Sequence, residues 1–191
     1  VLESGMLTKG KKVLEFENKF SDFLGVKYAL TTTSATTALH MSLVALGVGP
    51  GDEILVSDFT FPATANVVIQ TGAKPVLVDI DLSTYNINLN DLKNKITKKT
   101  KGIIVVDAFG YPVDIDKVRE TIGNNLFILE DAACAFGSMI NGKKSGSNAD
   151  ISCFSFHPRK VLTTGEGGMI VTNRFSRKNI NFTKSWRNFK C

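Results

Sequence analysis

Cysteine, histidine and long apolar runs are scarce in this sequence, and each scarcity argues against a class of protein. The 191 residues include three cysteines, at positions 134, 153 and 191, and two histidines. The cysteines show no Cys-x-x-Cys spacing, so no zinc cluster is predicted. This cysteine usage fits a reducing cytoplasm best. No stretch approaches the length of a membrane-spanning helix, and residues 1–12 lack the apolar core of a signal peptide. We therefore expect a cytoplasmic protein without a membrane partner.

Two nucleotide-binding signatures are also missing. No Gly-x-Gly-x-x-Gly opens a helix after the first predicted strand, which argues against a Rossmann dehydrogenase. Residues 137–143 match the first part of a phosphate-binding P-loop, but Lys144 stands where that loop needs Ser or Thr. A hairpin turn around Asn141 and Gly142 is the better interpretation.

The charge of the chain is positive but dispersed. The net charge of +5 comes from lysines that are scattered along the sequence, with only small clusters. This pattern is typical of solvated helix faces, so no nucleic-acid partner is expected. A positive potential near a site would suit an anionic substrate.

Apolar runs alternate with helical patterns along the chain. With 43% hydrophobic residues, the chain can bury a core and is most simply one domain. The alternation predicts an α/β fold. The last two strands are too close in sequence for a crossover helix, so the final strand is expected to run antiparallel. The predicted strands are 28–32, 54–57, 76–79, 103–107, 127–130, 151–156 and 169–172, and the predicted helices are 13–24, 35–46, 63–71, 91–96 and 115–122.

One lysine, Lys160, stands between a predicted buried strand and the glycine-rich segment 165–168. Strands on both sides pin its loop, so its amine can be held out of bulk water. A desolvated amine loses its proton more readily and becomes a nucleophile toward aldehydes, which makes Lys160 a candidate covalent catalyst. Most lysines are solvated surface residues instead, and Lys160 taken alone does not separate the two alternatives.

A lysine that forms a Schiff base implies pyridoxal phosphate, which also needs an anion site, a carboxylate for its ring nitrogen and a flat surface for its ring. Residues 33–39 follow a predicted strand and open a helical pattern, so they can face a phosphate or act only as a helix N-cap. Asp131 follows strand 127–130 and can keep a pyridine nitrogen protonated or cap the next element. Phe61, after strand 54–57, can cover one ring face or belong to the core.

Taken together, these features make the sequence resemble the DegT/StrS family of sugar aminotransferases, within the fold-type I pyridoxal-phosphate enzymes. The resemblance implies a three-layer α/β sandwich with a seven-stranded, mostly parallel sheet. It implies that residues 1–191 form the cofactor-binding large domain and that the small carboxyl-terminal domain is absent from this chain. The matching segments are 10–17, 34–39, 50–54, 60–66, 72–81, 130–133 and 155–168.

The resemblance also implies roles for individual residues. Lys160 is implied as the catalytic residue that binds the cofactor covalently, and Asp131 as the partner of the pyridinium nitrogen. The remaining implied cofactor-binding residues are Phe61 stacked on the ring, Thr36, the Thr37 backbone and Ser155 at the phosphate, and Cys134 near the ring, where relatives commonly carry His or Gln.

The activity implied by the resemblance belongs to polysaccharide biosynthesis. It is the transfer of an amino group from an amino acid, glutamate in most relatives, to a nucleotide-linked keto sugar. The presence of Lys160 argues against the dehydratase branch of the family, in which histidine replaces that lysine. A homodimer is expected, with residues near Arg187 at the subunit boundary. A non-catalytic domain of the same fold, with a binding or scaffolding role, remains the alternative.

Overall fold

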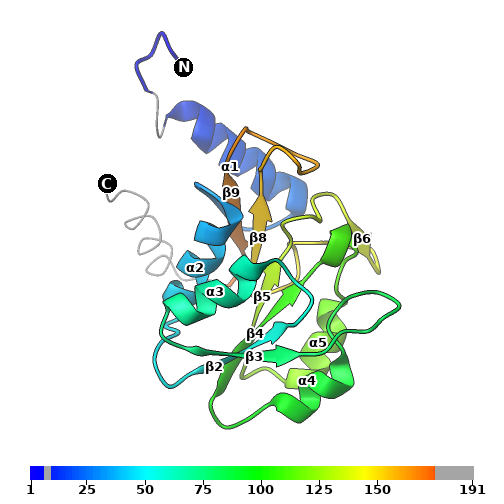
Figure 1. The fold of residues 1–191 in the computed structure, drawn as a ribbon. Coiled ribbons are helices and arrows are strands. Elements are labelled where there is room, and N and C mark those ends of the chain that lie inside the picture. Colours follow the sequence, from blue (N-terminus) through cyan, green and yellow to red (C-terminus); the bar gives the residue numbers. More distant parts are fainter. Residues whose placement is uncertain (7–9, 175–191) are drawn as a thin grey trace.

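A seven-stranded sheet forms the centre of the computed structural model, which describes residues 1–6 and 10–174 (Figure 1). The strand order is β1-β9-β8-β5-β4-β2-β3. The neighbours from β8 to β3 pair in parallel, whereas β9 lies antiparallel between β1 and β8. The predicted mostly parallel sheet and its antiparallel final strand are thereby confirmed. The strands are β1 Tyr28–Thr32, β2 Glu53–Ser57, β3 Lys74–Val78, β4 Thr100–Val106, β5 Phe127–Asp131, β8 Ile151–Ser155 and β9 Gly168–Thr172.

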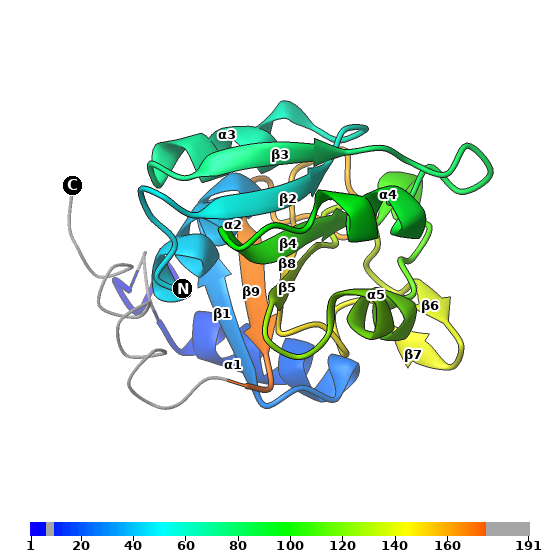
Figure 2. The ribbon, with the colours of Figure 1, turned by 90° about the horizontal axis from the view of Figure 1, so that it is seen from below.

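Helices cover both faces of this sheet and complete the three predicted layers (Figures 1 and 2). Helices α2 (Ala35–Ala45) and α3 (Pro62–Gln70) pack on one face. Helices α1 (Lys11–Leu24), α4 (Leu89–Lys95) and α5 (Ile115–Ile122) pack on the other. The fold is therefore an α/β sandwich with the sheet as its middle layer.

Side chains of the central strands alternate between these two faces. In β2, Ile54 and Val56 join the core beneath α2 and α3, whereas Leu55 joins the core beneath α4 and α5. All three are fully buried. Because both faces of a parallel sheet are covered, its strands appear in the sequence as continuous apolar runs. This is why the sequence reveals the strands of this chain.

Element ends differ from the predicted ones where polar residues take part. Helix α4 begins at Leu89 because the Asn88 side chain accepts the N–H groups of Asn90 and Asp91, a cap that lies ahead of the apolar pattern. Strand β4 begins at Thr100, before its apolar run, because its first residues are polar but still pair with β2.

The predicted hairpin is also present. Strands β6 (Met139–Ile140) and β7 (Lys143–Lys144) pair antiparallel at the outside of the molecule (Figure 2). Asn141 and Gly142 connect them with φ values of 50° and 76°. Two left-handed residues of these types make the tight turn that suits a two-residue hairpin. Among the described residues, no helix combines the length and the apolar character needed to cross a membrane.

Candidate active site

The carboxyl ends of β4, β5 and β8 border one open cavity of about 620 Å³. Strands β4, β5 and β8 are parallel neighbours or near neighbours, so the segments that leave them meet at one edge of the sheet, where ligands of such folds bind. Of the predicted site residues, those that line the cavity are Thr36, Phe61, Asp131, Cys134, Ser155 and Lys160. The fold thus brings together residues that are distant in the sequence.

Asp131 is the last residue of β5 and is buried. Its Oδ2 accepts a hydrogen bond of 3.0 Å from the Thr64 hydroxyl, and its Oδ1 accepts one of 3.2 Å from the Ala133 N–H group. Burial raises the pKa of the Asp131 carboxyl, whereas these two donors and the charge of Lys160 oppose the rise. A cation placed against this carboxylate would favour its ionised form, so the site suits a ligand with a protonated ring nitrogen.

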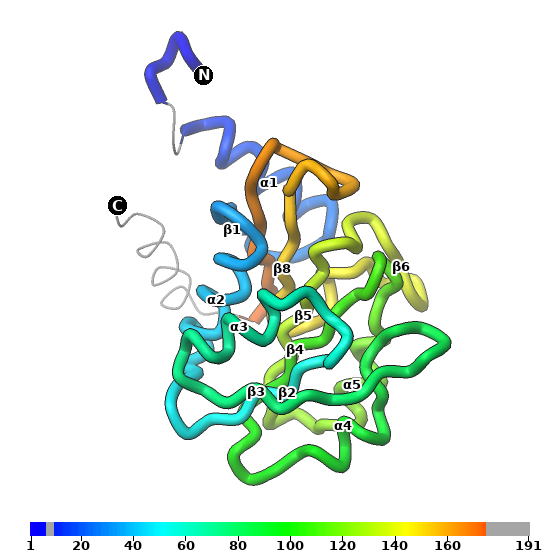
Figure 3. Tube along the Cα trace, in the orientation of Figure 1, coloured from blue at the N-terminus to red at the C-terminus, as the bar shows by residue number. Residues whose placement is uncertain are grey.

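Lys160 lies in the loop that connects β8 to β9, shown in orange in Figure 3. A backbone hydrogen bond from Phe156 N–H to Gly167 O at 2.9 Å closes the loop at its base, and one from Lys160 N–H to His157 O at 2.9 Å forms a turn within it. The Lys160 Nζ lies 3.0 Å from the Cys134 Sγ. The loop therefore holds the amine inside the cavity, beside the residue that was expected near a cofactor ring.

The start of α2 forms another wall of the cavity. Ser34 is the N-cap, and its Oγ accepts the Thr37 N–H group at 3.1 Å. Thr36 lines the cavity, whereas Thr37 is not among the described residues that line it. Ser155, which also lines the cavity and pairs with Gly168, accepts the His157 N–H group at 3.3 Å. Ser34 and Thr37 thus form the helix N-cap that was one of the two alternatives for residues 33–39. The positive end of the helix still faces the cavity.

Gly168 brings β9 close to this helix end. A Cβ atom built on Gly168 would overlap the Ser34 carbonyl group and would lie 2.7 Å from the Ala35 nitrogen. Only a residue without a side chain lets the strand and the helix terminus approach so closely. The glycine-rich exit of the Lys160 loop therefore also positions the start of α2.

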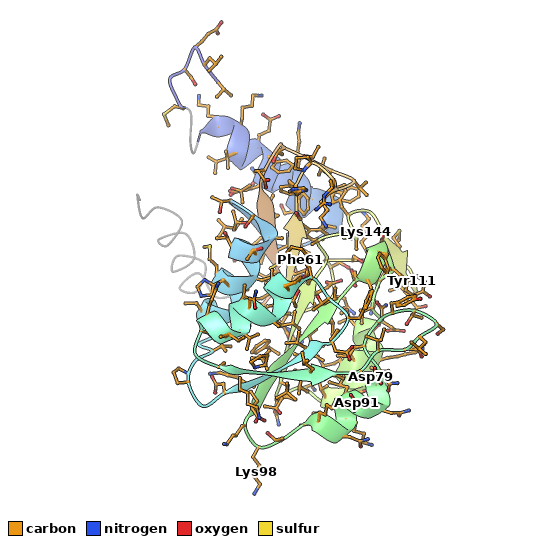
Figure 4. All side chains as sticks on the ribbon, in the orientation of Figure 1. Phe61, Asp79, Asp91, Lys98, Tyr111 and Lys144 are labelled. Atoms are coloured by element: carbon orange, nitrogen blue, oxygen red, sulfur yellow. The ribbon has the colours of Figure 1, made fainter. Side chains whose placement is uncertain are left out.

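Phe61 is the residue before α3 and is 71% exposed (Figure 4). It lines the cavity, and an aromatic ring that is this exposed contributes little to the core. Its position allows the ring to cover one face of a flat ligand.

Two carboxyl groups behind Asp131 were not predicted. Asp107 follows β4, and its Oδ1 accepts the Val113 N–H group at 2.9 Å. Burial raises the pKa of Asp107 to about 6, and the nearby Asp131 charge adds to this. Glu130 accepts hydrogen bonds from the Ser152 hydroxyl and the Gly146 N–H group. Burial, and then the charge of Asp107, raise the pKa of Glu130 well above its ordinary value. The pair favours a shared proton at neutral pH.

Sequence reasoning missed other residues that shape the cavity. The Thr64 hydroxyl donates a hydrogen bond to Asp131. The sequence could have indicated Thr64 as a site residue, because it lies one helical turn after Phe61. Asp107 and Glu130 had no such signal, since the burial of a carboxyl group depends on how strands and loops pack. The cavity is also lined by three residues that sequence reasoning missed, Phe59, Phe109 and Arg159.

Comparison with known proteins identifies the class to which this fold and this site belong. The family model described as the DegT/DnrJ/EryC1/StrS aminotransferase family matches residues 1–180. The chain belongs to this family. The predicted resemblance is confirmed.

Individual relatives extend this result. The GDP-perosamine synthase of Escherichia coli O157:H7 is 46% identical over 167 residues, which are 87% of this chain and 46% of the relative. The structure of DesV from S. venezuelae is 33% identical with a TM-score of 0.93 and covers 98% of this chain and 51% of DesV. The chain thus spans about half the length of the relatives it matches.

A dehydratase is structurally similar as well. The E. coli GDP-4-keto-6-deoxy-D-mannose-3-dehydratase, solved with bound hydrated pyridoxal phosphate, is 34% identical with a TM-score of 0.87. The similarity covers 91% of this chain and 46% of the dehydratase. The fold therefore does not distinguish transamination from dehydration. Only the residues in the cavity can distinguish these two reactions.

Proposed function

We propose that this chain is the cofactor-binding part of a pyridoxal-phosphate-dependent aminotransferase. The amino group would pass from an amino acid, with glutamate as the expected donor, to a nucleotide-linked keto sugar. The observation that carries the proposal is that the Lys160 amine and the buried Asp131 carboxylate line the same cavity, with the start of α2 as its wall. An amine, a carboxylate, an anion site and a flat surface for the ring are what this cofactor requires, and Phe61, which lines the same cavity, would supply the flat surface.

The residues present fit the cofactor. Lys160 would hold its aldehyde carbon covalently, and Asp131 would bind its ring nitrogen. Thr36, Ser155 and the end of α2 would hold its phosphate, because a helix N-terminus favours an anion. When bound, the cofactor supplies an electron sink that lets the carbon bearing the amino group lose a proton.

Each of these side chains would then have its own task. The Asp131 carboxylate would keep a proton on the ring nitrogen, and Thr64 would orient that carboxylate through its 3.0 Å hydrogen bond. The Lys160 amine, once displaced by the donor amine, would take up and return a proton within the cavity. Cys134 would guide the amine, since its sulfur lies 3.0 Å from Nζ.

Lys160 also favours transamination over dehydration. The lysine can both bind the cofactor and carry the proton, and the family resemblance implies histidine at this position in dehydratases. A binding or scaffolding domain without catalysis is the other candidate from the sequence. The experiment below separates it from an aminotransferase.

The experiment is to load the chain with pyridoxal phosphate, reduce it with borohydride and map the modified peptide. We expect the label on Lys160, and we expect Lys160→Ala to lose both the label and the reaction with glutamate while it keeps its fold. Lys98→Ala is the matched control, because Lys98 is an exposed lysine that does not line the cavity and that lies far from the cavity residue Phe61 in Figure 4. Label on any other lysine would overturn the assignment, and cofactor binding without a reaction with glutamate would favour the non-catalytic alternative.

A further inference from the structure

Three aromatic rings from three separate loops pack together, and two of them line the cavity. Phe59 follows β2, Tyr85 lies between β3 and α4, and Phe109 follows β4. The ring centroids are 5.4 Å apart for Phe59 and Tyr85, 5.7 Å for Phe59 and Phe109, and 5.9 Å for Tyr85 and Phe109. Phe59 and Phe109 line the same cavity as Lys160. We call these three residues the aromatic rim.

The rim is open to solvent. The exposed fractions are 42% for Phe59, 44% for Tyr85 and 78% for Phe109. The rings pack tilted or edge-on against one another, so they cover each other's faces only in part. Rings that expose this much surface add little to the core of the protein.

The backbone holds two of these rings in an unfavourable conformation. Tyr85 has a φ of 59° and Phe109 a φ of 54°, in the left-handed region that bulky side chains avoid. Neighbouring hydrogen bonds enforce the turns, from Tyr85 N–H to Asp81 O at 2.7 Å and from Gly110 N–H to Asp107 O at 3.1 Å. Glycine would adopt both turns without this cost. Strain that exposes an aromatic ring beside a reaction site indicates a binding role for the ring.

The chemistry of the proposed substrate supplies a ligand for the rim. A nucleotide-linked sugar must place its sugar beside Lys160, which leaves a flat heteroaromatic base at its other end. Aromatic rings bind such bases by stacking. Arg159, an exposed cation that lines the same cavity, can meet the diphosphate that connects the two ends.

We propose that Phe59, Tyr85 and Phe109 form the subsite that binds the base of the nucleotide-linked substrate. This inference rests on the proposed function and extends it, because it assigns the substrate's base to named residues. The rim acts on substrate affinity and specificity, whereas Lys160 and Asp131 act on the reaction.

A second copy of the chain is the alternative partner for the aromatic rim, but the exposed area of the rim argues against this partner. Aromatic side chains offer about 150–250 Å² each, so three partly exposed ones present at most about 400 Å². A stable interface buries about 800 Å² on each partner. The rim by itself is therefore too small for a dimer interface but large enough for one base.

The test is isothermal titration of the cofactor-loaded chain with GDP, with UDP and with pyrophosphate as the probe that lacks a base. We expect at least one nucleotide to bind more tightly than pyrophosphate. Tyr85→Ala should weaken nucleotide binding about tenfold, with pyrophosphate binding unchanged. Tyr85→Phe should bind nearly as the parent does, because it keeps the ring. Leu82→Ala is the matched control, since Leu82 lies on the same loop and is 82% exposed.

Phe109→Gly is a second ring-deleting variant that is expected to fold, because glycine removes the ring and also relieves the strain of the left-handed backbone. It should melt close to the parent and still bind the nucleotide about tenfold more weakly. The inference is overturned if neither nucleotide binds more tightly than pyrophosphate, or if both ring-deleting variants bind as the parent does. It is also overturned if these variants change only the oligomeric state in light scattering.

The outcomes also separate this inference from the proposed function. Loss of the covalent cofactor or of the reaction with glutamate in the parent chain would refute the proposed function, even where nucleotides bind at the rim. Normal cofactor chemistry without nucleotide binding would refute the rim alone.

Discussion

At the scale of single residues, Asp131 is expected to act through its charge. We expect Asp131→Asn to keep measurable cofactor binding but to lower the transamination rate at least about 100-fold, because a neutral amide does not stabilise a protonated ring nitrogen. Single-turnover absorbance with glutamate measures this rate. Asp58→Asn, which changes an exposed aspartate just after β2, should react as the parent does. A rate within a few-fold of the parent would make Asp131 a structural residue.

Asp107 is expected to make stability depend on pH. Burial raises its pKa from the ordinary 3.8 to about 6, so the folded chain holds this proton more tightly than the unfolded chain. Its contribution is therefore fully present below pH 3.8 and is lost as the pH rises through about 6. Asp107→Asn has no carboxyl group to ionise, so it does not lose this stability as the pH rises. Relative to the parent, the variant should gain about 1–3 kcal/mol of unfolding free energy between pH 4 and pH 8.

Urea unfolding of the chain without cofactor at several pH values measures this gain. Asp116→Asn provides the control, because Asp116 is exposed and the Lys143 and Asn148 side chains lower its pKa. If the difference between Asp107→Asn and the parent did not change with pH, Asp107 would not be the group that titrates. The buried neighbours Glu130 and Asp131 would then be the ones to test.

Single residues also mark the limit of what the sequence predicts. The positions of Lys160 and Asp131 at the cavity were predictable because Asp131 ends an apolar strand and Lys160 follows one, and strand ends converge in a parallel sheet. The left-handed backbone of Tyr85 and Phe109 was not, because neither residue type favours it and turn hydrogen bonds impose it. The role of Thr37 in the helix cap was open for a similar reason, since the same Thr and Ser residues suit a cap and a phosphate.

At the scale of elements, the contact of β9 with α2 depends on Gly168. We expect Gly168→Ala to cost about 1–3 kcal/mol of unfolding free energy, because its Cβ would overlap the Ser34 carbonyl group. Cofactor affinity should fall as well, since the start of α2 must shift. Urea unfolding and cofactor titration measure the two effects. Gly49→Ala is the matched control, because the nearest atom to its Cβ would be 4.0 Å away.

A variant Gly168→Ala with the stability and the cofactor affinity of the parent would show that the helix end moves freely.

Most elements themselves were predictable, since the strands are buried on both faces and the helices carry apolar stripes. The order of the strands was not. That β9 inserts between β1 and β8 follows from pairing between distant segments, which no local pattern in the sequence encodes.

At the scale of the whole molecule, we expect the chain to self-associate. Large apolar side chains at and near the cavity are open to solvent, because Phe61, which lines it, is 71% exposed and Val161, next to Lys160 in the sequence, is 81% exposed. Exposed apolar groups that gather at one site favour association. Light scattering at micromolar concentration should give a mass above the 20.8 kDa of one chain. A stable monomer that binds the cofactor would contradict the expected dimer. Arg187, expected at the subunit boundary, lies outside the described residues.

The position of β9 has a further consequence for how the chain folds. Among the described residues, β1 pairs with β9 alone, although β1 is the first and β9 the last of the described strands in the sequence. Pairing across such a sequence distance is slow. The Lys160 loop and the start of α2 meet through this same pairing. We therefore expect the cofactor to bind only after β1 and β9 have paired.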